Sequence, residues 1–491
     1  MKNSIAYFQT NIIQKLEETF LSYSTDMTKV AELVQGVTNC MIEFGLCLLA
    51  EELESYDSSI CEKKYLRPDW YVVRKEEATI LTSLGTLHYH KTWFRHKKTG
   101  VYECFLDRAM GLEPHARMTE DAEARILEEA VQTSYEKGGK NVSISSEEVS
   151  RETVKNKLHH LKFPKKETYP VEKKSVDYLY IEADEDHIAL QFREKKGDIT
   201  ENEYHQKNNG AIAKLIYVHE GIEWESDKNK RHVLKNPYYF CRVCEGKENQ
   251  ALWDEVYEYL ENTYDLSKVK KIYLSADGGK WITSGKREIA GIMYVLDEFH
   301  LKKYLKKITL CFRKIEKELE EELIESICNG TKKEFEEKIE ELKQEIQYAS
   351  VNKRIEEGKS YLLKNWTAAK LRLLRKNKVK GSSTEGHVSH VLSDRMSSRP
   401  MGWSKVGMSK MAELRAYYYN GGDMLELVRY QKEELPKAAG NEDIIYSSSQ
   451  MWREERKRRN ELGQLAEIKT YSIPYTQIKK IANFKAQIFG L

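Results

Sequence analysis

Two stretches decide the fold: YLYIEAD at Tyr178–Asp184 and VKKIYLSADGG at Val269–Gly279. Each is a short run of tyrosine, leucine and β-branched residues, which is typical of a buried strand. Each run closes on an aspartate, Asp184 in the first and Asp277 in the second. Ligands of open α/β sheets bind outside the carboxyl ends of the strands, so acids at those ends can share one site. We therefore expect the two aspartates to lie together.

The sequence around these stretches predicts an α/β unit. Strand-like runs occur near 177–183, 187–193, 211–219, 237–243, 270–276 and 292–296, with helix-like runs near 249–263 and after Gly279. Three β-rich runs followed by βαβ alternation is the order of an RNase H-like sheet with helices on both faces. We predict an RNase H-like catalytic domain formed by residues 171–300 and 380–430.

A third acid, Glu385, follows the polar turn at 381–384 and begins a helix-like stretch far beyond Asp277. The intervening chain is charged and helical in pattern, and it contains no strand-like run. We interpret residues 301–379 as a long α-helical insertion, which lets Glu385 join the sheet. Three such carboxylates can hold two Mg²⁺ or Mn²⁺ ions for in-line phosphoryl transfer, which predicts a protein that cuts or joins nucleic acid.

The choice of acids leaves alternatives. Taken alone, Asp277 before two glycines is a common turn residue. Near the first strand, Glu182, Asp184 and Asp186 alternate onto one face and Glu185 onto the other, so Glu182 or Asp186 could share the role of Asp184. We favour Asp184 because the apolar run ends there.

A further pair, Asp297 and His300, follows the strand-like run at 292–296. The spacing of three residues places both on one face of the first turn of a helix. Asp297 could be only an N-cap beside an exposed histidine. Next to the three acids, His300 could instead steady a phosphate or an exposed base, with Asp297 fixing the orientation of the imidazole ring.

The amino-terminal part divides by pattern into three segments. Residues 1–65 predict a helical arm with two helices, and residues 66–118 a small antiparallel β-rich domain. Residues 119–170 predict a helix up to Gly138 and Gly139, then a short helix, a turn near Ser150 and a second helix. Helix-turn-helix spacing would present to DNA the side chains Arg151, Lys155 and Asn156. An ordinary helical pair competes with that interpretation, and residues 431–491 predict a helical tail.

Composition and charge limit the kinds of partner and the compartment that we expect. The 491 residues carry a net charge of +2, but residues 361–420 contain 12 lysines and arginines against 3 acids, which suits a phosphate backbone or a solvated helix face. The longest apolar run, Phe44–Ala50, is too short to span a membrane. Eight scattered cysteines show no disulfide framework, which predicts a cytoplasmic protein. A protein that cuts or joins DNA would be nucleoid-associated there.

Two zinc sites are weaker alternatives. Cys241 and Cys244 have no second pair of ligands downstream, so strand residues are the better interpretation. The other set consists of His88, His90, His96 and Cys104, and a polar hairpin face explains it more simply.

Four motifs resemble those of Lre-type bacterial insertion-sequence transposases, a family related to the Mutator-like DDE transposases. They are Leu179–His187, Tyr273–Trp281, Glu385–Val391 and Arg395–Trp403. The resemblance covers residues 70–430 and implies a DDE triad of Asp184, Asp277 and Glu385 with a helical insertion before the glutamate. The Asp-x-x-His motif of the relatives matches Asp297 and His300.

The resemblance implies cleavage of double-stranded DNA at element ends and strand transfer into a target by a homo-oligomer using two Mg²⁺ or Mn²⁺ ions. Arg395, Arg399 and Lys405 would bind backbone phosphates, and Trp403 would stack on an unpaired base or pack in the core. Two other functions compete: an RNase H-like nuclease without strand transfer, and a catalytically decayed DNA-binding protein. The presence of all three acids disfavours decay.

Overall fold

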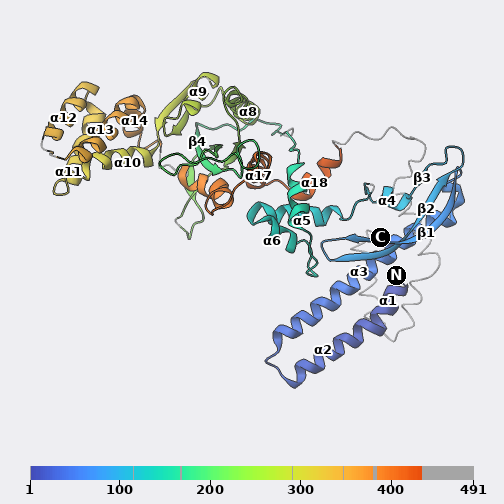
Figure 1. Ribbon diagram of the computed structural model, residues 1–491. Helices are drawn as coiled ribbons and strands as arrows, with labels where there is room; N and C mark the ends of the chain where they lie inside the picture. The colour runs from blue at the N-terminus through green and yellow to red at the C-terminus, as the bar shows by residue number, and fades with distance from the viewer. Residues whose placement is uncertain are drawn as a thin grey trace. The chain divides into compact units, whose positions relative to one another are not determined.

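The computed structural model describes residues 2–113, 115–165, 169–229, 231–289, 291–344, 346, 348–379 and 384–433 (Figure 1). They form two compact units. The first comprises residues up to 122 together with 143–147, and the second comprises 123–142 and 148–434. The predicted tail lies outside the described residues from 434 onward.

The first unit begins with a helical hairpin. The first arm consists of α1 (Lys2–Tyr7), the π-helical turn η1 (Phe8–Ile12) and α2 (Ile13–Thr25), and the second arm is α3 (Val30–Glu62). Lys15 pairs with Glu43 at 2.6 Å, so the two arms run antiparallel. This confirms the two helices expected near the amino terminus.

Helix α3 is longer and more continuous than the apolar run Phe44–Ala50 suggested. Within the described residues it is the one helix that could cross a membrane by length and composition. A core helix of a soluble protein or an amino-terminal signal sequence meets the same criterion, so this is weak evidence for a membrane span.

The rest of the first unit is a three-stranded antiparallel sheet. Its strands are β1 (Trp70–Leu81), β2 (Thr86–His96) and β3 (Tyr102–Glu103), flanked by η2 (Lys64–Leu66) and α4 (Phe105–Ala109). Apolar side chains of α3, including Leu46 and Leu53, pack on Leu87 and Tyr89 of β2. The third strand is short, because the chain turns into α4 directly after it and buries Phe105 and Leu106.

The second unit is built on a mixed five-stranded sheet with the order β10-β9-β4-β5-β8. The strands are β4 (Tyr178–Ala189), β5 (Gly210–His219), β8 (Tyr238–Arg242), β9 (Lys271–Ala276) and β10 (Ile292–Leu296). Strands β4, β9 and β10 are parallel, whereas β5 is antiparallel to both of its neighbours. A small hairpin of β6 (Ile222–Trp224) and β7 (His232–Leu234) follows β5.

One expectation about this sheet is wrong. The runs near 177–183 and 187–193 are a single strand, β4, because β5 pairs with it from Tyr180 opposite His219 to Ala189 opposite Gly210. The acidic run that looked like a break lies inside the strand. Asp184 is therefore mid-strand in β4, although its pairing with β9 ends two residues earlier, at Glu182 opposite Ser275.

Helices cover both faces of this sheet. On one face, α8 (Glu248–Thr263) and α9 (Lys280–Glu288) pack on alternate strand residues such as Leu179 and Ile181. On the other face, Ile188 and Leu215 join a second core with α5 (Glu120–Gln132), α7 (Arg151–His159), α17 (Lys405–Tyr419) and α18 (Met424–Glu433). The period-two alternation of each strand thus separates two apolar cores.

Residues 298–379 contain helices and no strand where the structure describes them. The five helices are α10 (Glu298–Thr309), α11 (Glu316–Asn329), α12 (Lys332–Gln344), α13 (Ala349–Lys364) and α14 (Trp366–Leu374). Figure 1 shows them as a bundle beside the sheet, and their apolar faces continue the core that α8 and α9 form. The mixed α/β architecture is therefore interrupted by a helical insertion between β10 and the last helices.

The predicted helix-turn-helix segment differs in its first half. Gly138 and Gly139 lie inside α6 (Tyr135–Lys140), and residues 145–149 are not helical. A Cβ at Gly139 would lie 2.2 Å from the carbonyl oxygen of Val149, so this glycine permits a close chain crossing rather than breaking a helix. The second predicted helix is present as α7, capped by Ser150.

Candidate active site

Three aspartates lie in one row across the three parallel strands: Asp184 inside β4, Asp277 directly after β9 and Asp297 directly after β10. Glu182 pairs with Ser275, so two residues further on Asp184 of β4 stands beside Asp277 after β9. Leu296 pairs with Ala276, so the next residues, Asp297 and Asp277, are also neighbours. All three follow the same strand face. The structure thus brings together Asp184, Asp277 and Asp297.

Asp184 has the most perturbed carboxyl group of the row. Burial, together with the nearby charges of Asp277 and Asp297, raises its pKa to about 6, although the hydrogen bond from the Glu185 amide and the charge of His300 oppose the shift. A strongly shifted carboxyl group beside a row of other acids marks Asp184 as a candidate site residue.

Asp297 and His300 form the pair that the spacing predicted. Oδ2 of Asp297 accepts a hydrogen bond from the main-chain N–H of His300 at 3.1 Å, which caps α10, and it lies 3.0 Å from the Nδ1 atom of the imidazole. The N-cap interpretation and the ring-orienting interpretation therefore both hold. The hydrogen bond to Asp297 raises the pKa of His300, and the charges of Asp297, Asp277 and Asp184 add to this shift although burial opposes it.

The loop after β9 is fixed from two sides. The Gly279 amide donates a hydrogen bond to Oδ1 of Asp277 at 2.8 Å, and Gly278 has a φ of +99°. A Cβ at Gly278 would lie 2.7 Å from Oδ1 of Asn365, so only glycine fits there. The hydroxyl group of Tyr361 donates a hydrogen bond to the main-chain carbonyl of Asp277. The helical insertion, through α13 and the residue after it, thus supports this loop.

Sequence reasoning missed Tyr361 and Asn365. Both lie more than 80 residues from Asp277 in the chain, and nothing in the insertion's charged helical pattern distinguishes them. The only available signal was the pair Gly278 and Gly279, which indicates that something approaches the loop closely.

Glu385 lies in α15 (Thr384–Val388), whose backbone continues through the π-helical turn η3 (Ser389–Ser393) into α16 (Asp394–Met396). The structure does not describe the Glu385 side chain. Two residues later, His387 accepts or donates a hydrogen bond at 3.0 Å with the hydroxyl group of Tyr239, and its ring lies 4.8 Å from that of Tyr217. Burial lowers the pKa of His387. These contacts fix α15 against strands β5 and β8 of the sheet.

The other acids of β4 have separate partners. Glu182 accepts a hydrogen bond from the hydroxyl group of Tyr217 at 2.6 Å, and the Ser397 hydroxyl donates to Asp186 at 2.7 Å. Glu185, on the opposite strand face, accepts from the indole N–H of Trp281 at 2.7 Å. Asp184 is thus the β4 acid that interacts most directly with Asp277 and His300.

Carboxylate oxygens are the ligands that suit Mg²⁺ and Mn²⁺. Among the side chains that the structure describes, no group of three or more His, Cys, Asp or Glu is arranged to hold a metal ion. The described part therefore supplies Asp184 and Asp277, and Glu385 would have to complete the set. Asp184 and Asp277 are therefore suitable as two of the ligands of a Mg²⁺ or Mn²⁺ ion.

The predicted helix-turn-helix contacts are accessible. Arg151 and Asn156 are exposed on α7, and Lys155 pairs with Glu152 on the helix surface. Arg399 and Lys405 are also exposed, Lys405 at the start of α17.

The expected phosphate contact of Arg395 requires a correction, and of the two alternatives for Trp403 the structure supports packing in the core. Arg395 is only 6% exposed, and its Nε donates a hydrogen bond to the carbonyl oxygen of Ala130 at 3.0 Å. Its guanidinium lies over the rings of Tyr135 and Trp403, and the indole N–H of Trp403 donates to the Met396 carbonyl oxygen. Both side chains are core components, because the apolar rings shield the charge from solvent and DNA alike. Trp403 therefore packs rather than stacks on a base.

The basic cluster at 361–420 is partly structural for the same reason. Arg372 is buried and pairs with Glu298 at 2.9 Å, and buried Arg415 donates hydrogen bonds to the carbonyl oxygens of Val391 and Val131. The number of lysines and arginines in residues 361–420 is therefore larger than the number that are exposed and could contact DNA.

The alternative zinc ligands have other contacts. His90 lies 2.8 Å from Glu54, and the ring of His96 accepts from the Thr99 amide at 3.1 Å. His88 is exposed, whereas Cys104 is buried. Cys241 lies in β8 and is buried, as is Cys244.

The second unit defines the class: a mixed α/β protein in which Asp184, Asp277 and Asp297 lie in one row across three adjacent parallel strands. A family model described as "Uncharacterised protein family (UPF0236)" matches residues 23–434. The chain belongs to this family. The match is wider than the resemblance over residues 70–430 indicated, and the family's description names no activity.

Relatives in this family span most of the chain. A UPF0236 protein of Caldanaerobacter subterraneus subsp. tengcongensis is 33% identical over 433 residues, which cover 88% of each chain. Another from the same organism, whose name joins eleven locus designations, is 33% identical over 87% of this chain and 85% of its own. A UPF0236 protein of Streptococcus gallolyticus, named for its place in the vanSb 3′ region, is 25% identical over 80% of this chain and 83% of its own.

Proposed function

We propose that the chain is a DDE transposase of an insertion sequence, with an RNase H-like catalytic domain in the second unit. The observation that carries the proposal is the row of Asp184, Asp277 and Asp297 on one face of three adjacent parallel strands, with His300 beside it. Polynucleotide cleavage by paired metal ions requires such converging carboxylates.

The sheet topology supports the fold assignment. Three antiparallel strands in sequence, β4, β5 and β8, are followed by β9 and β10, which return to lie parallel on the other side of β4. This order leaves β4 central, and the carboxyl end of β9 adjoins the middle of β4. An RNase H-like sheet has the same order, with helices on both faces.

Glu385 would be the third acid. Its backbone is part of α15, three residues before the buried Val388. The contacts of His387 with β5 and β8 hold this short helix on the face that carries Asp184. The insertion between β10 and α15 explains why the acid is so distant in sequence.

Different side chains of the protein would have different roles in the proposed DNA cleavage. Asp184, Asp277 and Glu385 would hold two Mg²⁺ or Mn²⁺ ions, which when bound supply an activated attacking oxygen and a stabilised leaving oxygen. His300, whose pKa is raised by its hydrogen bond with Asp297, would donate a hydrogen bond to a phosphate oxygen near the scissile bond. Tyr361 and Asn365 would keep the Asp277 loop in position before DNA binds.

Double-stranded DNA would be bound through exposed cations. Arg151, Lys155 and Asn156 on α7 would contact element ends, and Arg399 and Lys405 would contact backbone phosphates. The multiple locus designations of one relative in a single organism are consistent with a mobile element. We expect a homo-oligomer that pairs two ends in the cytoplasm.

The test is a cleavage and joining assay with a duplex that carries the inverted repeat flanking the coding segment. We expect Mg²⁺- or Mn²⁺-dependent nicking at the repeat end, and joining of a pre-cut end to a target plasmid. Asp277→Ala and Glu385→Gln should each abolish both reactions while end binding at low salt survives. Cleavage without joining would identify a nuclease, and full activity in Asp277→Ala would remove the metal site from the proposal.

A further inference from the structure

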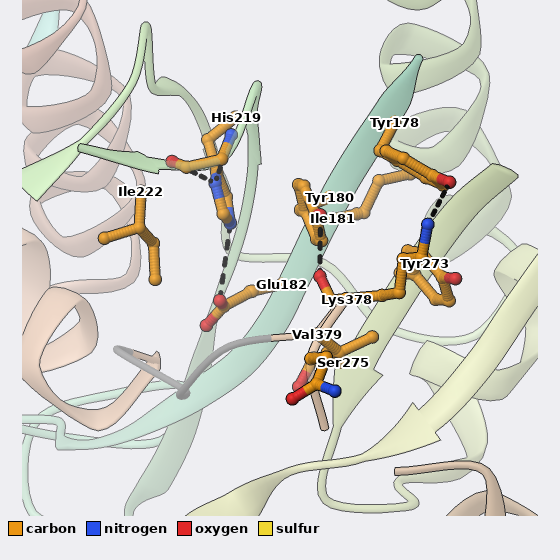
Figure 2. Close-up of a pocket in the computed structure, with 12 residues that line it drawn as sticks. Tyr178, Tyr180, Ile181, Glu182, His219, Ile222, Tyr273, Ser275, Lys378 and Val379 are labelled. Atoms are coloured by element: carbon orange, nitrogen blue, oxygen red, sulfur yellow. Dashed lines mark hydrogen bonds and ion pairs between the residues drawn. The ribbon is translucent and has the colours of Figure 1, made fainter. Parts of the chain in front are cut away.

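A cavity of about 260 Å³ lies on the same sheet face as the acids (Figure 2). Its lining includes Tyr180 and Glu182 of β4, Ser275 of β9, His219 at the end of β5, Ile222 of β6 and Lys378. Glu182 and Ser275 precede Asp184 and Asp277 by two residues each. At about 3.3 Å per residue, the cavity begins roughly 7 Å behind the carboxylates.

A row of aromatic rings forms one side of this cavity. The ring centroids of His219 and Tyr180 are 5.1 Å apart, and those of Tyr180 and Tyr273 are 5.7 Å apart. The planes in these two pairs differ by 17° and 20°. Tyr178 continues the row beside Tyr273 at 6.2 Å. Nearly parallel rings on three adjacent strands favour a planar aromatic ligand that adopts the same tilt.

Buried polar groups stand among these rings. Glu182 is 4% exposed, and its Oε1 lies 3.4 Å from Nε2 of His219, a contact visible in Figure 2. The buried hydroxyl group of Ser275 has no hydrogen-bond partner among the residues that the structure describes. A carboxylate accepts hydrogen bonds only, so the cavity is suited to a ligand that donates them.

A lysine side chain lies at the rim of the cavity. Lys378 is exposed, its Nζ lies 2.7 Å from the hydroxyl group of Tyr178, and its main-chain carbonyl accepts a hydrogen bond from Tyr180 at 2.8 Å. Pockets for drug-sized ligands begin at about 300 Å³, so this cavity matches a single ring system with a phosphate outside.

We propose that the cavity receives one unstacked nucleobase next to the scissile phosphate, and that Glu182 selects a base with an exocyclic amino group. Adenine, cytosine and guanine carry such a donor, and thymine does not; carboxylates accept from the cytosine amino group in known readout. Enzymes that act within a duplex commonly extrude a base into a pocket of this kind. The placement beside a cleavage site rests on the proposed function, whereas the chemistry of the cavity does not.

The cavity is tested first with deoxynucleoside monophosphates in saturation-transfer NMR on the full chain. We expect deoxycytidine and deoxyadenosine monophosphates to bind several-fold more tightly than thymidine monophosphate. Glu182→Gln keeps an acceptor for Tyr217 but adds an amide donor, so the ratio should shift toward thymidine monophosphate. A misfolded variant would weaken all ligands alike. Tyr204→Ala, at a side chain that is 80% exposed in the same unit, is the matched control and should change nothing.

Equal binding of all nucleotides, or an unchanged ratio in Glu182→Gln, would overturn the proposal. The second arm places 2-aminopurine at successive positions of a repeat-end duplex bound to Asp277→Ala, which prevents cleavage. A fluorescence change confined to one position beside the cleavage site, reduced in the Glu182→Gln double variant, is the expected result. If the wild type cleaves DNA and no position responds, the base pocket is refuted and the proposed function stands. If the wild type cleaves no DNA, the proposed function fails. The binding ratios of the deoxynucleoside monophosphates then decide whether the cavity binds a nucleobase.

Discussion

The hydroxyl group of Tyr361, in the helical insertion, donates its hydrogen bond to the main-chain carbonyl oxygen of Asp277, in the proposed catalytic row. The same tyrosine ring stacks on Tyr304 of α10 at a centroid distance of 3.6 Å. Two helices of the insertion therefore meet at the loop that carries the central acid. The insertion is a structural support for the proposed site as well as a spacer before Glu385.

Tyr361→Phe should test this support. The variant keeps the stacked ring and loses one hydrogen bond, which is worth about 0.5–1.5 kcal/mol. We expect the cleavage rate to fall by up to about tenfold while the melting temperature changes by only a few degrees. Tyr348→Phe, at a side chain of the same insertion that is 73% exposed, should match the wild type. An unchanged rate in Tyr361→Phe would mean that the loop holds its position without the insertion.

Asp297→Asn should separate the two roles of Asp297. Asparagine remains a good N-cap, so α10 should persist, but the charge that holds a proton on His300 is lost. Because the folded-state pKa of His300 is raised, the pair stabilises the fold below pH 6.5, and this stabilisation is lost as the pH rises through the folded-state value. We expect the NMR titration of His300 to move to lower pH in the variant.

The same spectra contain an internal control. His205 is an exposed histidine outside the row, and its imidazole signals should be the same in both proteins. If His300 titrates identically in both proteins, Asp297 acts as a helix cap alone.

Arg395 and Arg399 should give opposite results although they lie four residues apart. Arg395 is buried under the rings of Tyr135 and Trp403. Arg395→Ala removes the hydrogen bond to the Ala130 carbonyl oxygen and leaves a cavity. We expect the free energy of unfolding to fall by about 3 kcal/mol or more. Arg399 is exposed, so Arg399→Ala should preserve stability and weaken DNA binding, with a smaller salt dependence. Chemical denaturation and binding titrations at several salt concentrations measure both. A stable Arg395→Ala variant with weakened DNA binding would restore the phosphate role.

The sequence predicted the sheet because its strands carry strong period-two and apolar patterns. The acids after β9 and β10 could be placed because parallel strands end at a common edge. The continuity of β4 could not be predicted, since an acidic run inside a strand is stabilised only by its partners, here Tyr217, Trp281 and Ser397. Likewise, a lysine- and arginine-rich segment does not reveal which cations are buried. Arg395 and Arg415 are placed by main-chain carbonyl oxygens that are distant in sequence.

Asp184→Asn should stabilise the protein while abolishing the proposed cleavage. Burial and the charge of Asp277 raise the pKa of Asp184 to about 6, so the folded state binds a proton more tightly than the unfolded state. Stability therefore falls as the pH rises from about 4 to 6, and the full destabilisation persists above pH 6. Asparagine removes the ionised group, so the variant should be more stable by about 1–3 kcal/mol at pH 7.5. The difference should vanish near pH 4.

Denaturant unfolding at pH 4 and 7.5 measures this difference, and divalent cations extend the test. Mn²⁺ should raise the stability of the wild type at pH 7.5 because it binds the folded carboxylates, and it should have much less effect on Asp184→Asn. Asp227→Asn, at an exposed position of the same unit, should behave as the wild type in every condition. If the variant is less stable than the wild type at pH 7.5, the ionised carboxylate of Asp184 stabilises the fold through contacts within the protein. That result would contradict the proposal that the row of acids binds a cation.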